Sequence, residues 1–100
     1  MTSEIDAAIK AVDVGSLVSR LPKSPRVQDI LLEGYRDHMG ELSLRVVVVL
    51  DEKTKDADRQ WVKLEPIDRI VRDTLSEVGV TLYPYVRFFK RSELRKGAVA

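Results

Sequence analysis

Asp37, His38 and Glu41 are the side chains in this sequence whose types and spacing could do chemistry. They share one short polar segment, and a histidine beside two carboxylates can hold a divalent ion or act as a general base. His38 is the only histidine, cysteine is absent, and no nucleophile is identifiably paired with it. Because catalytic and metal sites need a larger constellation, we interpret the cluster as a polar turn and expect no catalytic residue, metal or cofactor. An enzyme that uses this cluster is the weakest functional hypothesis.

Two other features could contact a partner. Trp61 could be a hot spot on a binding surface, but tryptophan more often anchors the edge of a core, and we expect the anchor. The basic C-terminal end could contact phosphates, although such an end is more often a solvated tail. Its residues are Lys90, Arg91, Arg95 and Lys96, opposed by Glu93. The chain has no glycine-rich phosphate loop, so the sequence predicts no nucleotide cofactor.

The composition predicts one ordinary globular domain. The chain has 100 residues, 44% of them hydrophobic and 33% charged, and most domains contain about 100 to 150 residues. The 17 Lys plus Arg and 16 Asp plus Glu leave a net charge of +1, so binding to nucleic acid or an anionic membrane would need a local patch. Cysteine, a secretory signal and an apolar run of the roughly 20 residues that span a bilayer are all missing, which predicts a cytoplasmic protein.

Two helical segments are expected from apolar residues at helical spacing. The first begins near the N-terminus, is interrupted at Gly15 and ends near Leu21, before two prolines. The second begins with Pro66 as its first helical residue. Its apolar positions recur every three or four residues, and Gly79 ends it in the position that favours a left-handed residue.

Three strands are expected, and the clearest is the segment LSLRVVVVLD at 42–51. The segment RVQDILLEGY at 26–35 alternates apolar and polar residues, and the short linker that follows it predicts an antiparallel hairpin. The segment VTLYPYVRFFK at 80–90 is β-branched and aromatic, and Pro84 restricts it to an edge or makes its first half irregular. We expect a mobile charged loop at 52–60 and, from 91 to 100, a short turn or helix that frays into a basic tail.

The predicted order is α-β-β-α-β in a single α+β domain of residues 1–100. The helix before the last strand predicts a right-handed crossover, so the sheet should be mixed, with its helices on one face in a two-layer sandwich. A one-residue slip in register would exchange the two faces of any strand. The expected core consists of Ile9, Val12, Ile30, Leu32, Leu44, Val46, Val48, Leu50, Ile70, Val71, Leu75, Val86 and Phe88.

The other face of this sheet is too apolar and aromatic for a solvated surface, because two valines of the central strand belong to it. We predict that it binds a partner. The predicted partner-binding residues are Tyr35, Arg45, Val47, Val49, Tyr83, Tyr85, Arg87, Phe89 and Arg91. The alternative is that the N-terminal helix packs across this face and leaves no exposed patch.

The leading functional hypothesis is a small non-catalytic interaction module that binds a protein partner or a second copy of itself. The alternative is a KH-like or ribosome-associated RNA-binding protein, in which tyrosines stack on bases and arginines meet phosphates. Asp29, Glu33 and Asp51 lie on the same predicted face and would repel phosphates. The mixture of charges therefore favours a protein partner or a homodimer over RNA.

The predicted order of elements resembles a type II KH domain and the small ribosome-assembly factors that share its fold, with one helix fewer. This resemblance implies RNA binding. The Gly-x-x-Gly loop with which a KH domain grips the nucleic-acid backbone is absent, because Gly15, Gly34, Gly40 and Gly79 stand alone and the stretch before Pro66 is WVKLE. The order is also similar to that of the cytoplasmic domains of cation-efflux transporters, whose metal-binding histidines are missing here. We carry no site residue over from either family.

Overall fold

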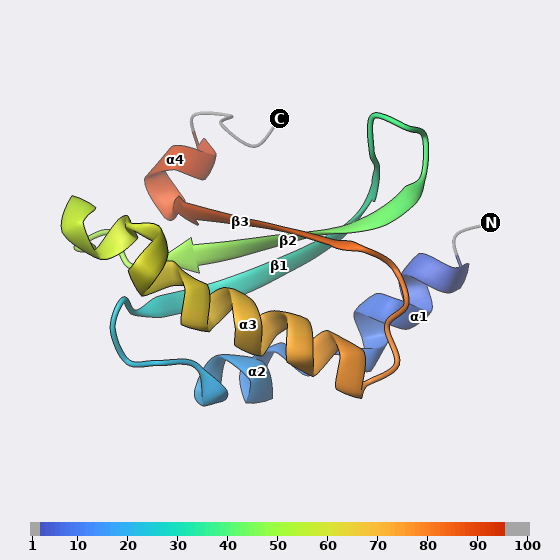
Figure 1. The fold of residues 1–100 in the computed structure, drawn as a ribbon, viewed down its shortest axis with the longest axis horizontal. Coiled ribbons are helices and arrows are strands. Elements are labelled where there is room, and N and C mark those ends of the chain that lie inside the picture. Colours follow the sequence, from blue (N-terminus) through green and yellow to red (C-terminus); the bar gives the residue numbers. More distant parts are fainter. Residues whose placement is uncertain (1–2, 96–100) are drawn as a thin grey trace.

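Three strands form one mixed sheet with β2 in its centre (Figure 1). In this computed structural model, which describes residues 3–95 and the side chains of residues 5–94, the strands are β1 (Val27–Arg36), β2 (Leu42–Leu50) and β3 (Pro84–Lys90). β1 pairs with β2 in antiparallel orientation, and β3 pairs with β2 in parallel orientation. The hairpin, the parallel crossover and the irregular segment before Pro84 are all as the sequence predicts.

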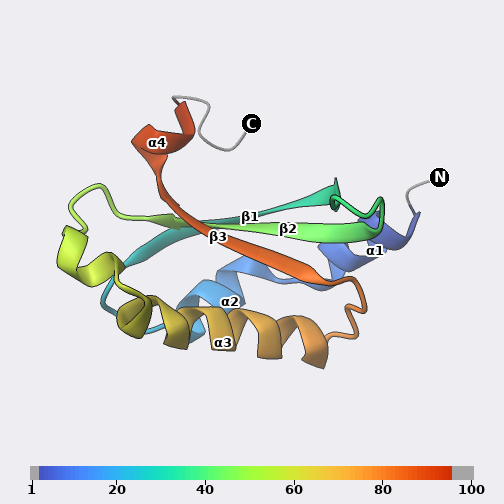
Figure 2. The same cartoon turned by 45° about the horizontal axis from the view of Figure 1, so that its top comes forward.

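The three longer helices lie together on one side of the sheet. They are α1 (Ser3–Ala11), α2 (Val14–Arg20) and α3 (Trp61–Glu77). Figure 2 shows α2 and α3 beneath the strands and the short C-terminal helix α4 (Arg91–Arg95) on the opposite side. The order α-α-β-β-α-β therefore confirms a two-layer α+β domain.

The core lies between the sheet and these helices, and the central strand is its middle. On β2 the alternate residues Leu44, Val46, Val48 and Leu50 are fully buried, because the strand is paired on both sides and covered by helices on one face. The register expected for all three strands is confirmed. The buried core cluster comprises Ile5, Ala8, Val12, Leu17, Leu21, Val27, Ile30, Leu44, Val46, Val48, Leu50, Leu64, Ile67, Val71, Leu75 and Leu82.

The first helical segment breaks earlier than expected. Asp13 separates α1 from α2 and caps α2, because its carboxylate accepts a hydrogen bond from the Ser16 amide at 3.1 Å. This satisfies an amide that has no partner within the helix. Gly15 lies inside the first turn of α2, so the prediction that it interrupts the helix is wrong. The predicted end near Leu21 is confirmed.

The long helix α3 begins at Trp61, five residues before the expected start at Pro66. The amides of Lys63 and Leu64 both donate to the Gln60 carbonyl, at 2.8 and 3.1 Å, and close the first turn. Pro66 is therefore an internal residue, and one carbonyl in the preceding turn loses its helical donor. At the other end Gly79 has a φ of 84°, as predicted for the residue that ends the helix.

The charged segment at 52–60 contains the short 3-10 helix η1 (Asp56–Arg59) and is tied to α4. The Arg59 guanidinium donates to both carboxylate oxygens of Glu93, at 2.9 and 3.0 Å. The Glu52 carboxylate accepts from the Ser92 amide and hydroxyl, at 2.6 and 2.8 Å. These contacts join two segments that are distant in sequence. The mobility predicted for this loop stays a prediction, and residues 96–100 of the expected tail lie outside the described range.

Replacing Glu93 with Gln should destabilise the protein in a way that depends on pH. Hydrogen bonds from Arg59 and then from the Lys90 amide lower the pKa of Glu93 below its ordinary value of 4.5. The ionised form is thus favoured in the folded state, so its contribution is complete above pH 4.5 and is lost as the pH falls through the lowered pKa. We expect a loss on the order of 1 kcal/mol at neutral pH, since the pair is partly exposed.

Urea unfolding followed by circular dichroism at several pH values tests this expectation. The difference in free energy of unfolding between Glu93→Gln and the unsubstituted protein should become smaller below pH 4.5. The matched control is Glu77→Gln, which removes a more exposed pair with Arg20. A gap that stays constant with pH, or one no larger than in the control, would contradict the role assigned to Glu93.

Candidate interaction surface

None of the three longer helices covers the sheet face that lies opposite the core. Helix α1, the candidate cover, packs on the core side, where Ile5 lies so close to Gly34 that a Cβ there would be 2.5 Å from Ile5 Cδ1. The alternative in which the N-terminal helix crosses the second face is therefore wrong. We call this second surface the open face. It consists of Asp29, Leu31, Glu33 and Tyr35 from β1, Ser43, Arg45, Val47 and Val49 from β2, and Tyr85, Arg87 and Phe89 from β3.

The two valines of the open face are buried although none of α1, α2 and α3 lies over them. Val47 is 3% exposed and Val49 is 0% exposed. The register explains this, because Val47 is flanked by Leu31 and Arg87. Val49 is flanked in the same way by an aspartate and a phenylalanine. The expectation that these valines need a second covering layer is therefore corrected, and they form the floor of the open face.

The part of the open face that a partner would meet is made by the side chains around this floor. Leu31 is 40% exposed although it lies beside buried Val47. Across the same row Arg87 is exposed, and within residues 5–94 it has no ion pair. Phe89 is half-buried next to Val49. An apolar floor edged by a leucine, a phenylalanine and an arginine is thus the centre of this surface.

Two other arginines of this region lie beside carboxylates. Arg45 Nη1 is 3.3 Å from Glu33 Oε1, and the Arg91 guanidinium is 3.8 Å from the Asp29 carboxylate. Both pairs are at least partly exposed, so each adds little to stability. They matter for electrostatics, because the two arginines that could contact phosphates already have acidic neighbours, and these carboxylates would repel a phosphate.

Three tyrosines form a row at the hairpin end of the open face. The rings of Tyr35 and Tyr85 are 5.5 Å apart and those of Tyr83 and Tyr85 are 4.8 Å apart, both edge to face. An arginine lies over each end of the row, with Arg45 4.2 Å from the Tyr35 ring and Arg72 of α3 5.6 Å from the Tyr83 ring. Edge-to-face packing and cation–π contacts hold such rows in place. Tyr83, just before β3, remains 58% exposed.

The predicted chemical cluster is a structured turn in which Asp37 is the main residue. One carboxylate oxygen of Asp37 accepts from the amides of Met39 and Glu41, both at 2.9 Å, and the other accepts from the Tyr85 hydroxyl at 3.1 Å. This is the use of an aspartate expected in a polar turn. His38 is exposed, and among residues 3–95 no group of three or more His, Cys, Asp or Glu side chains could hold a metal ion.

Replacing Tyr85 with Phe should raise the pKa of Asp37. The Glu41 amide is the strongest of the hydrogen-bond donors that lower this pKa below its ordinary value of 3.8, while partial burial opposes them, and Met39 and Tyr85 add to the lowering. Removing the hydroxyl takes away one donor to the ionised form, so the pKa should move upward. Titration of the carboxyl carbon by NMR measures it. Tyr35→Phe is the control and should leave the pKa of Asp37 unchanged. If the pKa of Asp37 is also unchanged in Tyr85→Phe, the hydrogen bond between Tyr85 and Asp37 is refuted.

Trp61 does not have the position that the sequence favours. It is the first residue of α3 and is 59% exposed, and its neighbour Val62 is 73% exposed. The prediction of a core-edge anchor is therefore wrong. The physical reason is that α3 starts earlier than predicted, so that Trp61 and Val62 lie in a first helical turn that extends beyond the core. At the basic end, Lys90 donates its backbone amide to Glu93 at 2.7 Å, while the Arg95 side chain and Lys96 lie outside what the structure describes.

Fold and surface together define a small two-layer α+β domain in which α1, α2 and α3 all lie on one face of the sheet. Comparisons with protein-family models, with curated proteins and with solved structures found no match to this chain. Across residues 3–95, no helix is both long enough and apolar enough to cross a membrane.

Proposed function

We propose that this protein is a non-catalytic interaction module that binds a segment of a partner protein through the open face and β3. The observation that carries the proposal is the one-sided packing of α1, α2 and α3 (Figure 2). It leaves a sheet face that none of these three helices covers, with a buried valine floor edged by more accessible side chains. Leu31 on β1 and Tyr83 just before β3 are exposed, and apolar and aromatic groups supply binding energy at protein interfaces.

The charges of the open face support a protein partner over RNA. Both acidic and basic side chains belong to it, and Arg45 and Arg91 are next to Glu33 and Asp29. A phosphate backbone would have to displace or approach these carboxylates, which costs electrostatic energy. A polypeptide can present both acidic and basic side chains, so it can complement the mixed charges of the open face.

The last strand supports the proposal in a second way. β3 is at an edge of the sheet, with a hydrogen-bonded neighbour on one side only. An extended partner segment can add to such an edge through its main chain while its side chains contact the sheet face. Pro84, at the start of β3, has no amide to offer, so the residues after it are the ones available for pairing.

A foreign protein is the occupant that we propose, in preference to a second copy. The middle row of the open face is Leu31, Val47 and Arg87. A two-fold axis along this row would bring the two Arg87 side chains together, and like charges in contact oppose association. Light scattering over a range of concentrations tests this choice. We expect the measured mass to remain that of a single chain at every concentration. A dimer would contradict the choice of a foreign partner.

Capture from cell lysate, with and without nuclease, tests the class of partner. We expect a protein that is retained after nuclease treatment, released by a substitution in the open face and unaffected by the same substitution elsewhere. Loss of all bound material on nuclease treatment, together with affinity that falls steeply with salt, would favour RNA and contradict the proposal.

A further inference from the structure

A hollow lies at the hairpin end of the open face, next to the row of tyrosines. Its volume is about 430 Å³ and it opens to solvent. Asp37 and Glu41 from the turn, Ser43 from β2, Leu82 from the segment before β3, and Tyr83 and Tyr85 contribute to its walls. Side chains from two separate stretches of the chain, 37–43 and 81–85, thus meet there.

The walls of this hollow carry negative charge and no basic side chain. Asp37 receives its hydrogen bonds from two backbone amides and a tyrosine hydroxyl, so neutral donors hold the carboxylate without cancelling its charge. The Glu41 carboxylate is exposed and, within residues 5–94, has no hydrogen bond or ion pair. The neighbouring Arg36 guanidinium donates to the Gly40 carbonyl at 2.9 Å and is not part of the walls.

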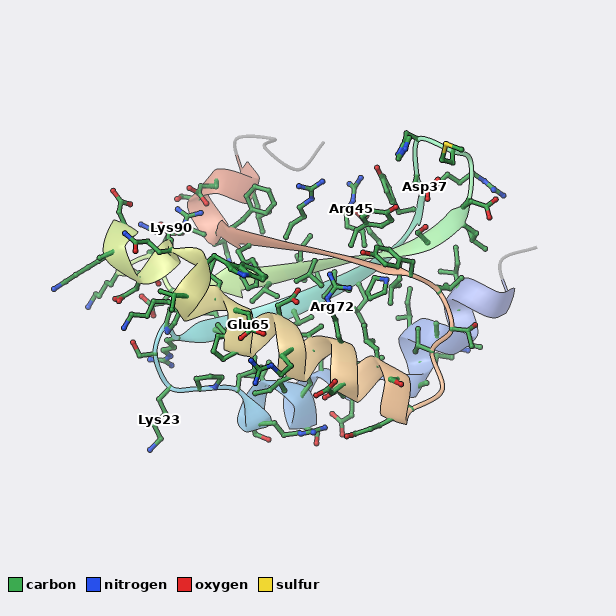
Figure 3. All side chains as sticks on the ribbon, in the orientation of Figure 1. Lys23, Asp37, Arg45, Glu65, Arg72 and Lys90 are labelled. Atoms are coloured by element: carbon green, nitrogen blue, oxygen red, sulfur yellow. The ribbon has the colours of Figure 1, made fainter. Side chains whose placement is uncertain are left out.

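The tyrosine row already contacts two cations. Arg45 lies over Tyr35 at one end and Arg72 lies near Tyr83 at the other. Figure 3 shows Arg45 and Arg72 on either side of the start of β3, with Asp37 beyond them on the hairpin. The faces of tyrosine rings attract cations because of their quadrupole. The hollow adds a place beside Tyr83 and Tyr85 where a further cation would also meet two carboxylates.

We infer that this hollow binds the cationic side chain of a lysine or arginine presented by the partner protein. The inference rests on the proposed function and names the chemistry of the partner. Rings of Tyr83 and Tyr85 would contact the cation, while Asp37 and Glu41 would balance its charge. An acidic side chain would be repelled there, and a neutral one would gain no charge interaction in exchange for its lost hydration.

Titration of the isotope-labelled protein with a short peptide tests the inference by NMR. The probe is acetyl-Gly-Arg-Gly-amide, and the matched control replaces arginine with citrulline, which has the same shape without the charge. We expect the arginine peptide to shift the amides of Met39, Glu41 and Tyr83. The citrulline peptide should not shift them, and equal shifts with both peptides would overturn the inference.

Glu41→Gln is the decisive variant, because it removes a charge while the Glu41 backbone keeps its hydrogen bonds to Asp37. We expect it to weaken binding of the arginine peptide about fivefold, the effect of one unit charge at contact distance in water. Glu65→Gln removes the same charge on α3, away from the hollow, and should leave binding unchanged. Unchanged binding in Glu41→Gln would refute the assignment.

The outcomes separate this inference from the proposed function. If the arginine peptide does not bind but a partner protein is still released by a substitution at Leu31, the hollow is wrongly assigned and the interaction module stands. If the peptide binds in a Glu41-dependent way but no captured protein depends on Leu31, the hollow is correctly assigned and the proposed use of the open face is wrong.

Discussion

Replacing Leu44 with Ala is expected to destabilise the domain by about 2 to 5 kcal/mol. Leu44 is fully buried on the central strand, and its side chain belongs to the cluster that joins the sheet to the helices. Truncation removes apolar contacts on the core side and leaves a cavity that a strand paired on both sides cannot close. Since a domain of this size has a total stability of about 5 to 15 kcal/mol, this is a large part of it.

Urea denaturation measured by circular dichroism gives the free energy of unfolding for this comparison. The matched control is Leu31→Ala, the same substitution at a residue of the neighbouring strand that is 40% exposed. It should cost no more than about 1 kcal/mol, because less apolar surface is removed from the buried state. If both variants lose the same free energy of unfolding, the assignment of Leu44 to the buried face and Leu31 to the open face is contradicted.

Replacing Leu31 with Lys should weaken binding of the partner protein at least about tenfold, which corresponds to roughly 1.4 kcal/mol. Leu31 stands at the edge of the apolar floor, beside Val47, and a bound segment would have to bury the new charge there. The substitution places a lysine between Asp29 and Glu33 on the same face of β1, which favours it electrostatically. The folded domain should therefore tolerate it.

Val62→Lys is the matched control for this prediction, since Val62 is an exposed aliphatic residue on the first turn of α3. It should leave the affinity unchanged. Affinity for the captured partner is measured by calorimetry or by surface binding, and unfolding curves of both variants establish that they are folded. Equal affinity for the Leu31→Lys variant and the unsubstituted protein would rule out the open face as the binding surface.

The same variant separates a protein partner from RNA by the sign of its effect. An added lysine at position 31, in the same row as Arg87 but on the other side of Val47, increases the positive charge of the open face, and affinity for a phosphate backbone rises with each added cation. RNA binding should therefore become stronger in Leu31→Lys, whereas protein binding should become weaker. No change of conditions is needed to tell the two hypotheses apart.

The prediction of the sheet from the sequence was accurate because its signals are local. Strand β2 is specified by a nearly continuous run of apolar residues, LSLRVVVVL, and a shift by one residue would turn Ser43 and Arg45 toward the helices. The end of α3 at Gly79 follows from the left-handed backbone there. The start of α3 was predicted wrongly, because Pro66 is compatible with both a first position and an internal position of a helix. Trp61 was misplaced for the same reason.

The candidate surface was predicted less completely than the fold. Alternation along β2 and β3 correctly assigned Tyr85, Arg87 and Phe89 to one face. It did not show that Val47 and Val49 are shielded within a single chain, since that depends on the side chains that the register places beside them. The sequence predicts a polar turn that contains Asp37, but not that Asp37 is its centre, and the hydrogen bond from Tyr85 to Asp37 joins residues far apart in the chain. No spacing rule reports such a contact.

The sequence by itself determined which elements form, how the strands alternate and which residues of the central strand enter the core, because these follow from hydrophobic period and turn chemistry within a few residues. Only the tertiary structure decided on which side of the sheet α1 packs. An amphipathic helix can bury its apolar stripe against either face, and the choice depends on long-range packing such as that of Ile5 against Gly34. That choice keeps α1 off the open face, beside which lies the hollow of Asp37, Glu41, Tyr83 and Tyr85.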